Sequence, residues 1–148
     1  MTGYSRFVGV ASLAAAAALS AGAAQAEPGG FAGGFSFQSD DLVAGPDVQI
    51  LSGYAIAELQ DNGAYRVGLV ATDFYQNAEG SRRVYALQLC TGQPEGAEMV
   101  ITCQVSETTG SNYTPDDFRL QQVPGSPVLW RGTLSSNGTA PVEFIDLD

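Results

Sequence analysis

Apolar residues recur at every second position along much of this chain, which is the period of a β-strand that presents alternate side chains to a core. The alternation becomes regular from Val48 onward. Four even positions of the first such stretch are apolar: Val48, Ile50, Tyr54 and Ile56. Gln49 and Gly53 stand between them. This pattern predicts a strand that carries the four apolar side chains on one face.

Turn-forming sequences divide the pattern into short segments. Asp61-Asn62-Gly63 is a strong hairpin signal, because Asn and Gly both tolerate positive φ, and residues 64–75 after it predict the returning strand. One face of that strand is apolar: Tyr65, Val67, Leu69 and Ala71. Residues 76–81 and Asn137-Gly138 mark further turns. We therefore expect successive antiparallel hairpins.

The most distinctive stretch holds both cysteines of the chain. Cys90 ends an apolar run that starts at Val84, and Cys103 lies in a second apolar run over residues 99–105. The positions midway between the cysteines fall in Pro94-Glu95-Gly96-Ala97, where turn chemistry is strongest. This spacing predicts a β-hairpin stapled by a Cys90–Cys103 disulfide.

Two further features concern single elements. Residues 84–90 are apolar at even and odd positions alike, which predicts a central strand buried on both faces. Thr114-Pro115-Asp116-Asp117 combines a capping hydroxyl, a proline and two acids, which is typical of a helix start, so we expect one helical turn there. Short strands are predicted at residues 118–122, 128–135 and 142–147.

These segments predict an antiparallel all-β fold of seven or eight strands that contains the one stapled hairpin. A sandwich and a small flattened up-and-down barrel both bury alternating residues, and both suit a domain of about 110 ordered residues. The sequence leaves these two architectures open.

The start of the chain has the form of a secretory signal peptide. Arg6 precedes an apolar stretch, and Ala24-Gln25-Ala26 is a small-x-small cleavage site. We predict that residues 1–26 are removed by cleavage after Ala26, with no stable membrane insertion afterwards. This predicts a periplasmic or secreted protein, in an oxidising compartment where the two cysteines pair.

Glycine dominates the residues that follow the predicted cleavage site. Residues 27–45 are therefore expected to form a flexible leader, in which Phe35-Ser36-Phe37 offers at most a short edge strand. Residues 46–148 are predicted to form a single all-β domain.

The charge of the chain narrows its partners. The 148 residues include six arginines, sixteen acids and neither lysine nor histidine, for a net charge of −10. Removal of residues 1–26 takes away one arginine and no acid, so the predicted mature chain carries −11. Such a surface repels nucleic acid and anionic lipid. It would attract a cationic protein, a cationic peptide or a divalent metal, although the simpler explanation is that the acidity keeps an exported protein soluble.

The missing residue types exclude most common enzyme mechanisms. Without histidine or lysine the chain cannot build a Ser-His-Asp or Cys-His arrangement, a Schiff base or a histidine-ligated metal site. The glycine pairs at 29–30 and 33–34 lack the spacing of a nucleotide-binding loop. The sequence therefore favours a non-enzymatic role and predicts no cofactor.

Carboxylate chemistry is still available, since a glycosidase needs only two acids. The acids in predicted strands or at strand ends are Glu58, Asp73, Glu107, Asp116 and Asp117. Asp73 interrupts an apolar strand, but we expect it to pair with Arg66 or Arg82 or to face water. Arg82-Arg83 is expected to provide counter-charges for neighbouring carboxylates. No catalytic residue is predicted.

Calcium is the most credible metal, since it accepts oxygen ligands alone. The acids considered for it are Asp40, Asp41 and Asp47, or Asp116 and Asp117. Their spacing matches no known calcium loop, so no metal site is predicted.

These observations favour an exported, non-catalytic β-domain that acts by binding another protein or as a structural component of the envelope. One alternative is an inhibitor of a cationic secreted hydrolase such as lysozyme. A second is a carboxylate-dependent polysaccharide hydrolase, which would need two buried carboxyls in an open groove with exposed aromatics. A third is a carrier of small apolar ligands, which would need a closed barrel with an empty interior.

Overall fold

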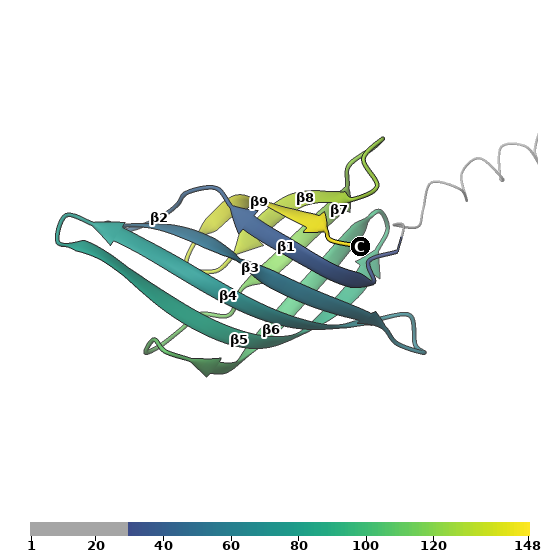
Figure 1. The fold of residues 1–148 in the computed structure, drawn as a ribbon, viewed down its shortest axis with the longest axis horizontal. Coiled ribbons are helices and arrows are strands. Elements are labelled where there is room, and N and C mark those ends of the chain that lie inside the picture. The colour runs from purple at the N-terminus through teal and green to yellow at the C-terminus, as the bar shows by residue number, and fades with distance from the viewer. Residues whose placement is uncertain (1–29) are drawn as a thin grey trace, which may run out of the picture.

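The computed structural model describes residues 30–148, which form nine antiparallel strands and no helix (Figure 1). The strands are β1 (Gly33–Ser39), β2 (Leu42–Ala44), β3 (Asp47–Leu59), β4 (Tyr65–Asn77), β5 (Gly80–Glu95), β6 (Glu98–Thr108), β7 (Asp117–Gln122), β8 (Leu129–Ser135) and β9 (Thr139–Asp146). The predicted signal peptide, residues 1–26, and the start of the predicted leader lie outside the described residues.

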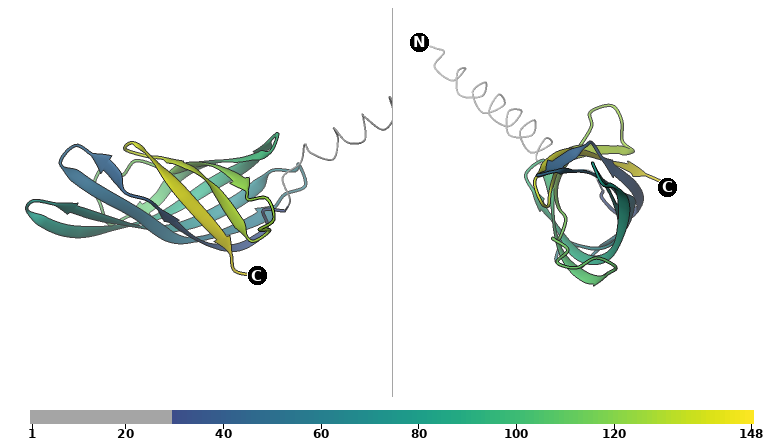
Figure 2. Two further views of the ribbon diagram at one scale, coloured as in Figure 1. Left: turned by 90° about the horizontal axis from the view of Figure 1, so that it is seen from above. Right: turned by 90° about the vertical axis from the view of Figure 1, so that its left-hand side faces the viewer.

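Eight of the strands close into a barrel. Strands β3 to β9 pair in chain order, β9 pairs with β1, and β1 pairs with β3. Strand β2 is the extra one and pairs with the first residues of β3. The end-on view in Figure 2 shows the resulting ring. The predicted antiparallel all-β class is confirmed, and the architecture is the up-and-down barrel, in which each strand pairs with its neighbours in the chain.

Strand β1 closes the barrel, although the sequence predicts a flexible leader there. It pairs with β3 on one side and with β9 on the other, so the prediction is wrong for residues 33–44, and β1 is not an edge strand. Phe35 and Phe37 point into the barrel and are buried, whereas Ser36 and Gln38 face outward. Burial of the two rings stabilises a strand whose glycines give it little β-propensity of its own.

Aromatic rings fill one end of the barrel. Phe31 stacks on Phe35, with 4.5 Å between ring centroids, and meets Trp130 edge-on at 5.1 Å. Phe37 stacks on Phe144 at 5.0 Å. All five rings are buried. The interior at this end is therefore a packed core, unlike the empty interior that an apolar-ligand carrier requires.

The apolar even positions of β3 do share one face, but it is the outer face of the barrel. Tyr54 and Ile56 are each 64% exposed, whereas Ala55 and Ala57 are buried. The packing gives the reason, because Phe35 of β1 lies directly opposite Ala55. Small side chains on the inner face of β3 leave room for the aromatic rings.

Strand β5 is apolar on both faces and buried on only one. Its inward residues include Val84, Ala86 and Cys90, while Tyr85 and Leu89 point outward and are exposed. The prediction of burial on both faces is wrong, since the outer face of a single barrel has no second layer to cover it. On β4 the predicted apolar face is the buried one: Tyr65, Val67, Leu69 and Ala71.

The stapled hairpin is confirmed. Cys90 lies directly opposite Cys103, and their sulfurs are bonded at 2.01 Å. The turn consists of Gly96 and Ala97, between β5 and β6. Gly96 has a φ of 59°, a conformation that glycine adopts without strain. Both cysteines are buried, so the disulfide is part of the hydrophobic core.

The helical turn predicted at Thr114-Pro115-Asp116-Asp117 is wrong. Residues 113–116 have no regular structure, and β7 begins at Asp117. The side chain of Asp116 is fully buried. It turns into the barrel, where Gln88 and Tyr113 hold it, and a carboxyl held in this way is not free to lie at a helix start.

Candidate functional site

The end of the barrel opposite the aromatic rings is polar, and we call it the mouth. It is formed by the starts of β3 and β5, the end of β4 and the loop between β6 and β7. The buried polar side chains of residues 30–148 lie toward this end: Ser39, Gln49, Asp73, Gln88 and Asp116. A buried polar group is costly unless it is hydrogen-bonded, so the partners of these side chains decide what the mouth can do.

Asp116 is held by a tight set of hydrogen bonds. Gln88 donates from Nε2 to Oδ2 of Asp116 at 2.6 Å and accepts from the Asp116 backbone N–H at 3.0 Å. The hydroxyl of Tyr113 also donates to Oδ2, at 2.7 Å. Burial nevertheless raises the pKa of Asp116 to about 6, and the nearby charge of Asp73 adds to the increase.

Asp73 is the second buried carboxyl, on the inner face of β4. The hydroxyl of Tyr75 donates to its Oδ2 at 3.3 Å. Burial raises the pKa of Asp73, although Gln49, Tyr113 and the charge of Arg82 act against that increase. The expectation that Asp73 pairs with Arg66 or Arg82 or faces water is wrong, because its side chain is buried among tyrosines and amides.

Two tyrosines link these carboxyls. Burial, together with the negative charges of Asp73 and Asp116, raises the pKa of Tyr113 far above its usual range. Burial and Asp73 likewise raise the pKa of Tyr75 to about 12. Both tyrosines therefore stay protonated at physiological pH and act as hydrogen-bond donors to the carboxyls.

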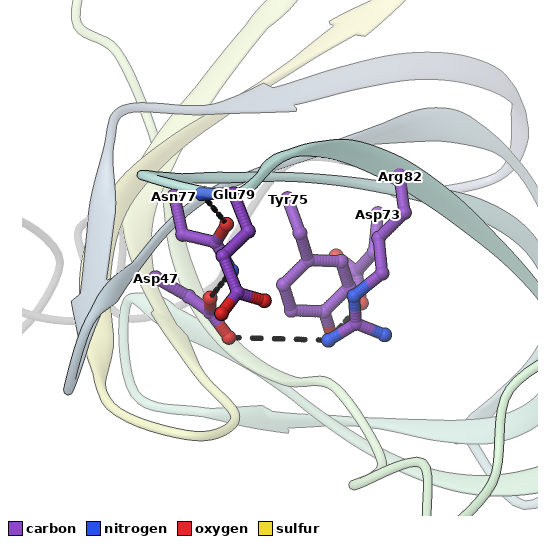
Figure 3. Close-up of polar contacts among 6 residues, drawn as sticks. All are labelled: Asp47, Asp73, Tyr75, Asn77, Glu79 and Arg82. Carbon is purple, nitrogen blue, oxygen red and sulfur yellow. Dashed lines mark hydrogen bonds and ion pairs between the residues drawn. The ribbon is translucent and has the colours of Figure 1, made fainter.

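The rim of the mouth carries further charges around the Tyr75 ring (Figure 3). The guanidinium of Arg82 lies over that ring, 4.2 Å from its centroid, and 3.9 Å from a carboxylate oxygen of Asp47. Asn77 donates to the other oxygen of Asp47 at 2.8 Å and accepts from the backbone N–H of Glu79 at 2.8 Å. The expected role of Arg82 as a counter-charge is confirmed for Asp47.

Several buried polar atoms of the mouth have no hydrogen-bond partner. They are Nε2 and Oε1 of Gln49, Oδ1 of Asp73 and Oδ1 of Asp116, and the one other such atom within residues 30–148 is Nε1 of Trp130. Unpartnered buried atoms are rare in folded proteins and indicate a bound water, an ion or a functional group. The mouth thus has unused hydrogen-bonding capacity in its interior.

The remaining acids named from the sequence are dispersed. Glu58 pairs with Arg66 at 3.1 Å on the outer surface, and Glu107 is exposed. Asp117 accepts from the backbone N–H of Cys103 at 2.9 Å. Asp40 and Asp41 are exposed in the connection between β1 and β2, where both line a pocket with Ile50 and Pro141. Residues 30–148 contain no group of three acids, cysteines or histidines that could hold a metal ion.

Sequence reasoning found Asp73 and Asp116 but missed Gln49, Gln88 and Tyr113. Gln88 alternates with Ala86 and Cys90, so its inward position could be inferred once the inner face of β5 is known. Gln49, like the inward Ala55 and Ala57, is at an odd-numbered position of β3, so its inward position could be inferred in the same way. Tyr113 lies in an irregular loop, where no periodicity indicates the direction of a side chain.

A second surface of interest is the outer face of β3, β4 and β5, which we call the apolar wall. Its exposed apolar side chains are Tyr54, Ile56, Val70, Tyr85, Leu87 and Leu89. The strand register places Tyr54, Val70 and Leu87 in one row across the three strands. Ile56 and Leu89 flank Gly68 in the next row. The side chains therefore form one continuous patch.

Charged residues lie at both ends of this wall and along one side of it, where the exposed Glu107 of β6 is opposite Leu87. One end is the row of Glu58 and Arg66, and the other is Arg83 on β5, whose guanidinium lies 5.8 Å from the centroid of the Phe74 ring. A hollow of about 700 Å³ adjoins the patch, with Tyr54 and Tyr85 among its lining residues. Exposed apolar patches of this kind mark interaction sites in soluble proteins.

The mouth and the wall differ in what they can do chemically. Asp73 and Asp116 are buried and accept hydrogen bonds from Tyr75 and Tyr113, whereas the acids of a glycoside hydrolase flank an open groove. The wall is apolar on β3, β4 and β5, and Glu107 of β6 borders it at Leu87.

No protein-family model, no curated protein and no solved structure matches this chain. In the part of the chain that the structure describes, no helix has the length and apolarity needed to cross a membrane.

Proposed function

We propose that this protein is an exported, non-catalytic binding domain whose apolar wall docks a protein partner. The observation that carries the proposal is the continuous row of Tyr54, Val70 and Leu87, flanked by Ile56 and Leu89, on a surface that faces solvent. A chain with a net charge of −10 has ample polar residues for solubility, so six apolar side chains gathered on one face require another explanation.

The composition of the wall supports a protein as the partner. Apolar side chains form the centre of protein interfaces, and tyrosine is among the residues that contribute most to binding energy. Tyr54 and Tyr85 have the largest side chains of the wall and are both exposed. Each carries an apolar ring and a hydroxyl that can hydrogen-bond at the edge of the interface.

The charge of the molecule supports a cationic partner. Glu107 lies beside Leu87 of the wall and Glu58 lies at one end of it, and a strongly negative molecule attracts a positive one over several ångströms in low salt. We therefore expect the partner to carry an apolar centre with basic residues around it. A cationic secreted hydrolase has this chemistry, so inhibition of such an enzyme is one form that the binding could take.

The test is capture of the partner from envelope and secreted fractions by the chain lacking residues 1–26. Val70→Asp places a charge at the centre of the wall and should reduce capture about tenfold or more, because the carboxylate would be buried without a partner. Thr133→Asp is the matched control, since Thr133 is an exposed residue on β8, across the barrel from β4.

The outcomes separate the hypotheses. Equal loss of capture in both variants, or no loss in either, would contradict docking on the wall. A homodimer of the purified chain that Val70→Asp converts to a monomer would show that a second copy covers the wall in place of a partner. Added salt should also lower the association rate constant of the complex. Its dissociation rate constant should change little, because the interface is apolar.

A further inference from the structure

The loop between β6 and β7, residues 109–116, is attached to the barrel at both of its ends, and we call it the mouth loop. Thr109 attaches its start to β5. The backbone N–H of Thr109 donates to the carbonyl oxygen of Tyr85 at 3.0 Å, and its hydroxyl accepts from the backbone N–H of Tyr85 at 3.0 Å. Residues 110–113 then line a pocket of about 310 Å³ at the mouth.

Asp116 attaches the other end of the mouth loop by its buried side chain. Gln88 and Tyr113 both donate to its Oδ2, at 2.6 Å and 2.7 Å, and Tyr113 itself belongs to the mouth loop. A further hydrogen bond, from the hydroxyl of Thr114 to Oδ1 of Asn137, joins neutral groups, as do the bonds of Thr109. Hydrogen bonds between neutral groups do not change over physiological pH. The attachment at Asp116 is therefore the one that depends on a titrating group.

This attachment belongs to a buried site with two carboxyls. Asp116 is 0% exposed and Asp73 is 1% exposed, and none of the ion pairs within residues 30–148 includes either of them. Arg82 remains at the rim, where its side chain is 61% exposed and pairs with Asp47 at 3.9 Å. Two buried negative charges without a paired cation repel each other and lose their hydration. The arrangement therefore favours a proton on one of the two carboxyls.

The hydrogen bonds of the site favour the same charge state. Tyr113 donates its one hydroxyl proton to Asp116, and Tyr75 donates its own to Asp73. Oδ1 of each carboxyl has no donor, and Nε2 of Gln49 is a single unpartnered donor for these two oxygens. A carboxyl that keeps its proton needs fewer donors than a carboxylate does. One proton thus removes a charge and a shortage of donors together.

The ionisable groups around Asp116 come from three strands and from the mouth loop. Tyr75 and Tyr113 stay protonated, because burial and the negative charges of the carboxyls raise the pKa of both. Burial also raises the pKa of Asp73 and brings that of Asp116 to about 6. The full set is Asp47 of β3, Asp73 and Tyr75 of β4, Arg82 of β5, Tyr113 of the mouth loop and Glu79 at the rim.

We propose that the mouth loop is a pH-dependent lid, which is closed while Asp73 and Asp116 hold a proton between them and opens when both are ionised. Opening moves the side chains of Asp116 and Tyr113 out of the barrel, so that the carboxylate of Asp116 regains its hydration. Thr109 is the hinge, since its bonds to Tyr85 do not depend on pH. Strand β7 keeps its place, because its ladders to β6 and β8 begin after Asp116.

Native-state hydrogen exchange tests the lid through the backbone N–H of Asp116, which bonds to Oε1 of Gln88 in the closed form. Protection of this amide, corrected for intrinsic exchange, should fall about tenfold between about pH 5 and about pH 7.5, because the closed form holds its proton to higher pH than the open one. Low concentrations of urea should leave the exchange of this amide unchanged, since opening of a loop exposes little surface. Amides of β4 should lose protection with urea, because they exchange through global unfolding.

Asp116→Asn removes the titrating charge and should keep the amide of residue 116 equally protected at both pH values. If that variant does not fold, Asp73→Asn leaves a single buried charge and should raise protection at about pH 7.5 by about threefold or more over the wild type. Asp41→Asn, at an exposed acid in the connection between β1 and β2, is the control and should retain the tenfold fall.

Three results would overturn the proposal. They are equal protection of the Asp116 amide at both pH values in the wild type, the same fall in Asp116→Asn as in the wild type, and a urea dependence of this amide equal to that of β4. The last of these would mean that pH changes global stability without opening the lid. The measurement uses the purified chain alone, so its result is independent of the capture experiment on the wall.

Discussion

At the scale of single residues, the mouth combines two buried carboxyls, each with one oxygen that has no hydrogen-bond partner. The carboxylate of Asp116 accepts two hydrogen bonds, from Gln88 and Tyr113, and its backbone N–H donates a third to Gln88. Hydrogen bonds to a carboxylate lower its pKa, and burial raises it. Burial has the larger effect here, since the pKa of Asp116 rises to about 6.

This balance predicts the pH dependence of stability. The folded state holds the proton of Asp116 up to about pH 6, whereas the unfolded chain loses it near pH 4. Protonation therefore stabilises the fold below about pH 4, and this contribution is lost as the pH rises to 6, by up to about 3 kcal/mol. Asp116→Asn should flatten the stability curve over this interval, measured by urea unfolding at several pH values.

The comparison needs a control, because the whole chain is acidic and its self-repulsion also grows with pH. Asp41→Asn removes one exposed acid in the connection between β1 and β2 and should retain the slope of the wild type. The raised pKa of Asp73 acts in the same direction and persists in both variants. A slope in Asp116→Asn equal to that of the wild type would contradict the assignment.

At the scale of the elements, the sequence predicts pairing well and predicts the inner faces poorly. The Asn-Gly turns and the two cysteines are local signals, and they place the β3–β4 and β5–β6 hairpins correctly. The inner faces of β3 and β5 depend on which side chains the barrel has room for. Both strands are apolar on both faces, so the alternation of their residues does not show which face points into the barrel.

Closure of the barrel is the other feature that local patterns do not contain. Strand β1 meets β3 and β9, and the latter is more than a hundred positions away in the chain. Only the alternation of Phe35 and Phe37 with polar residues hints at a strand there. The residues of the mouth are likewise contributed by separate strands and by a loop, so sequence reasoning names Asp47, Asp73, Arg82 and Asp116 without bringing them together as one site.

Close approach of neighbouring strands gives a prediction at this scale. A Cβ added to Gly132 of β8 would collide with the backbone carbonyl oxygen of Arg119 on β7, which no side-chain movement can relieve. Gly132→Ala should therefore destabilise the fold by roughly 1–3 kcal/mol, as strained substitutions do. Gly68→Ala is the matched control, because Gly68 is also in a strand and its added Cβ meets no atom within 4 Å. Thermal unfolding of both variants measures the difference, and equal melting temperatures would contradict the argument.

At the scale of the whole molecule, one short strand decides whether the sheet has edges. Without β1, the strands β3 and β9 would each expose a row of unpaired backbone groups, which is a template for aggregation. The aromatic core would also lose Phe31, Phe35 and Phe37, and with them the ring contacts to Phe144 and Trp130. Removal of each such ring from a core costs about 3–5 kcal/mol, which together exceeds the stability of a typical domain of this size.

A chain that begins at Asp40 should therefore fail to form a soluble monomer, whereas a chain that begins at Glu27 should fold. Circular dichroism and size-exclusion chromatography distinguish the two results. A synthetic peptide of residues 30–39 added to the shorter chain provides the sharper test, since it can pair with β3 and β9 and restore the rings. Recovery of a soluble, folded complex would show that closure by β1 is what the shorter chain lacks. A folded monomer that begins at Asp40 would instead mean that the remaining strands hold the core without closure.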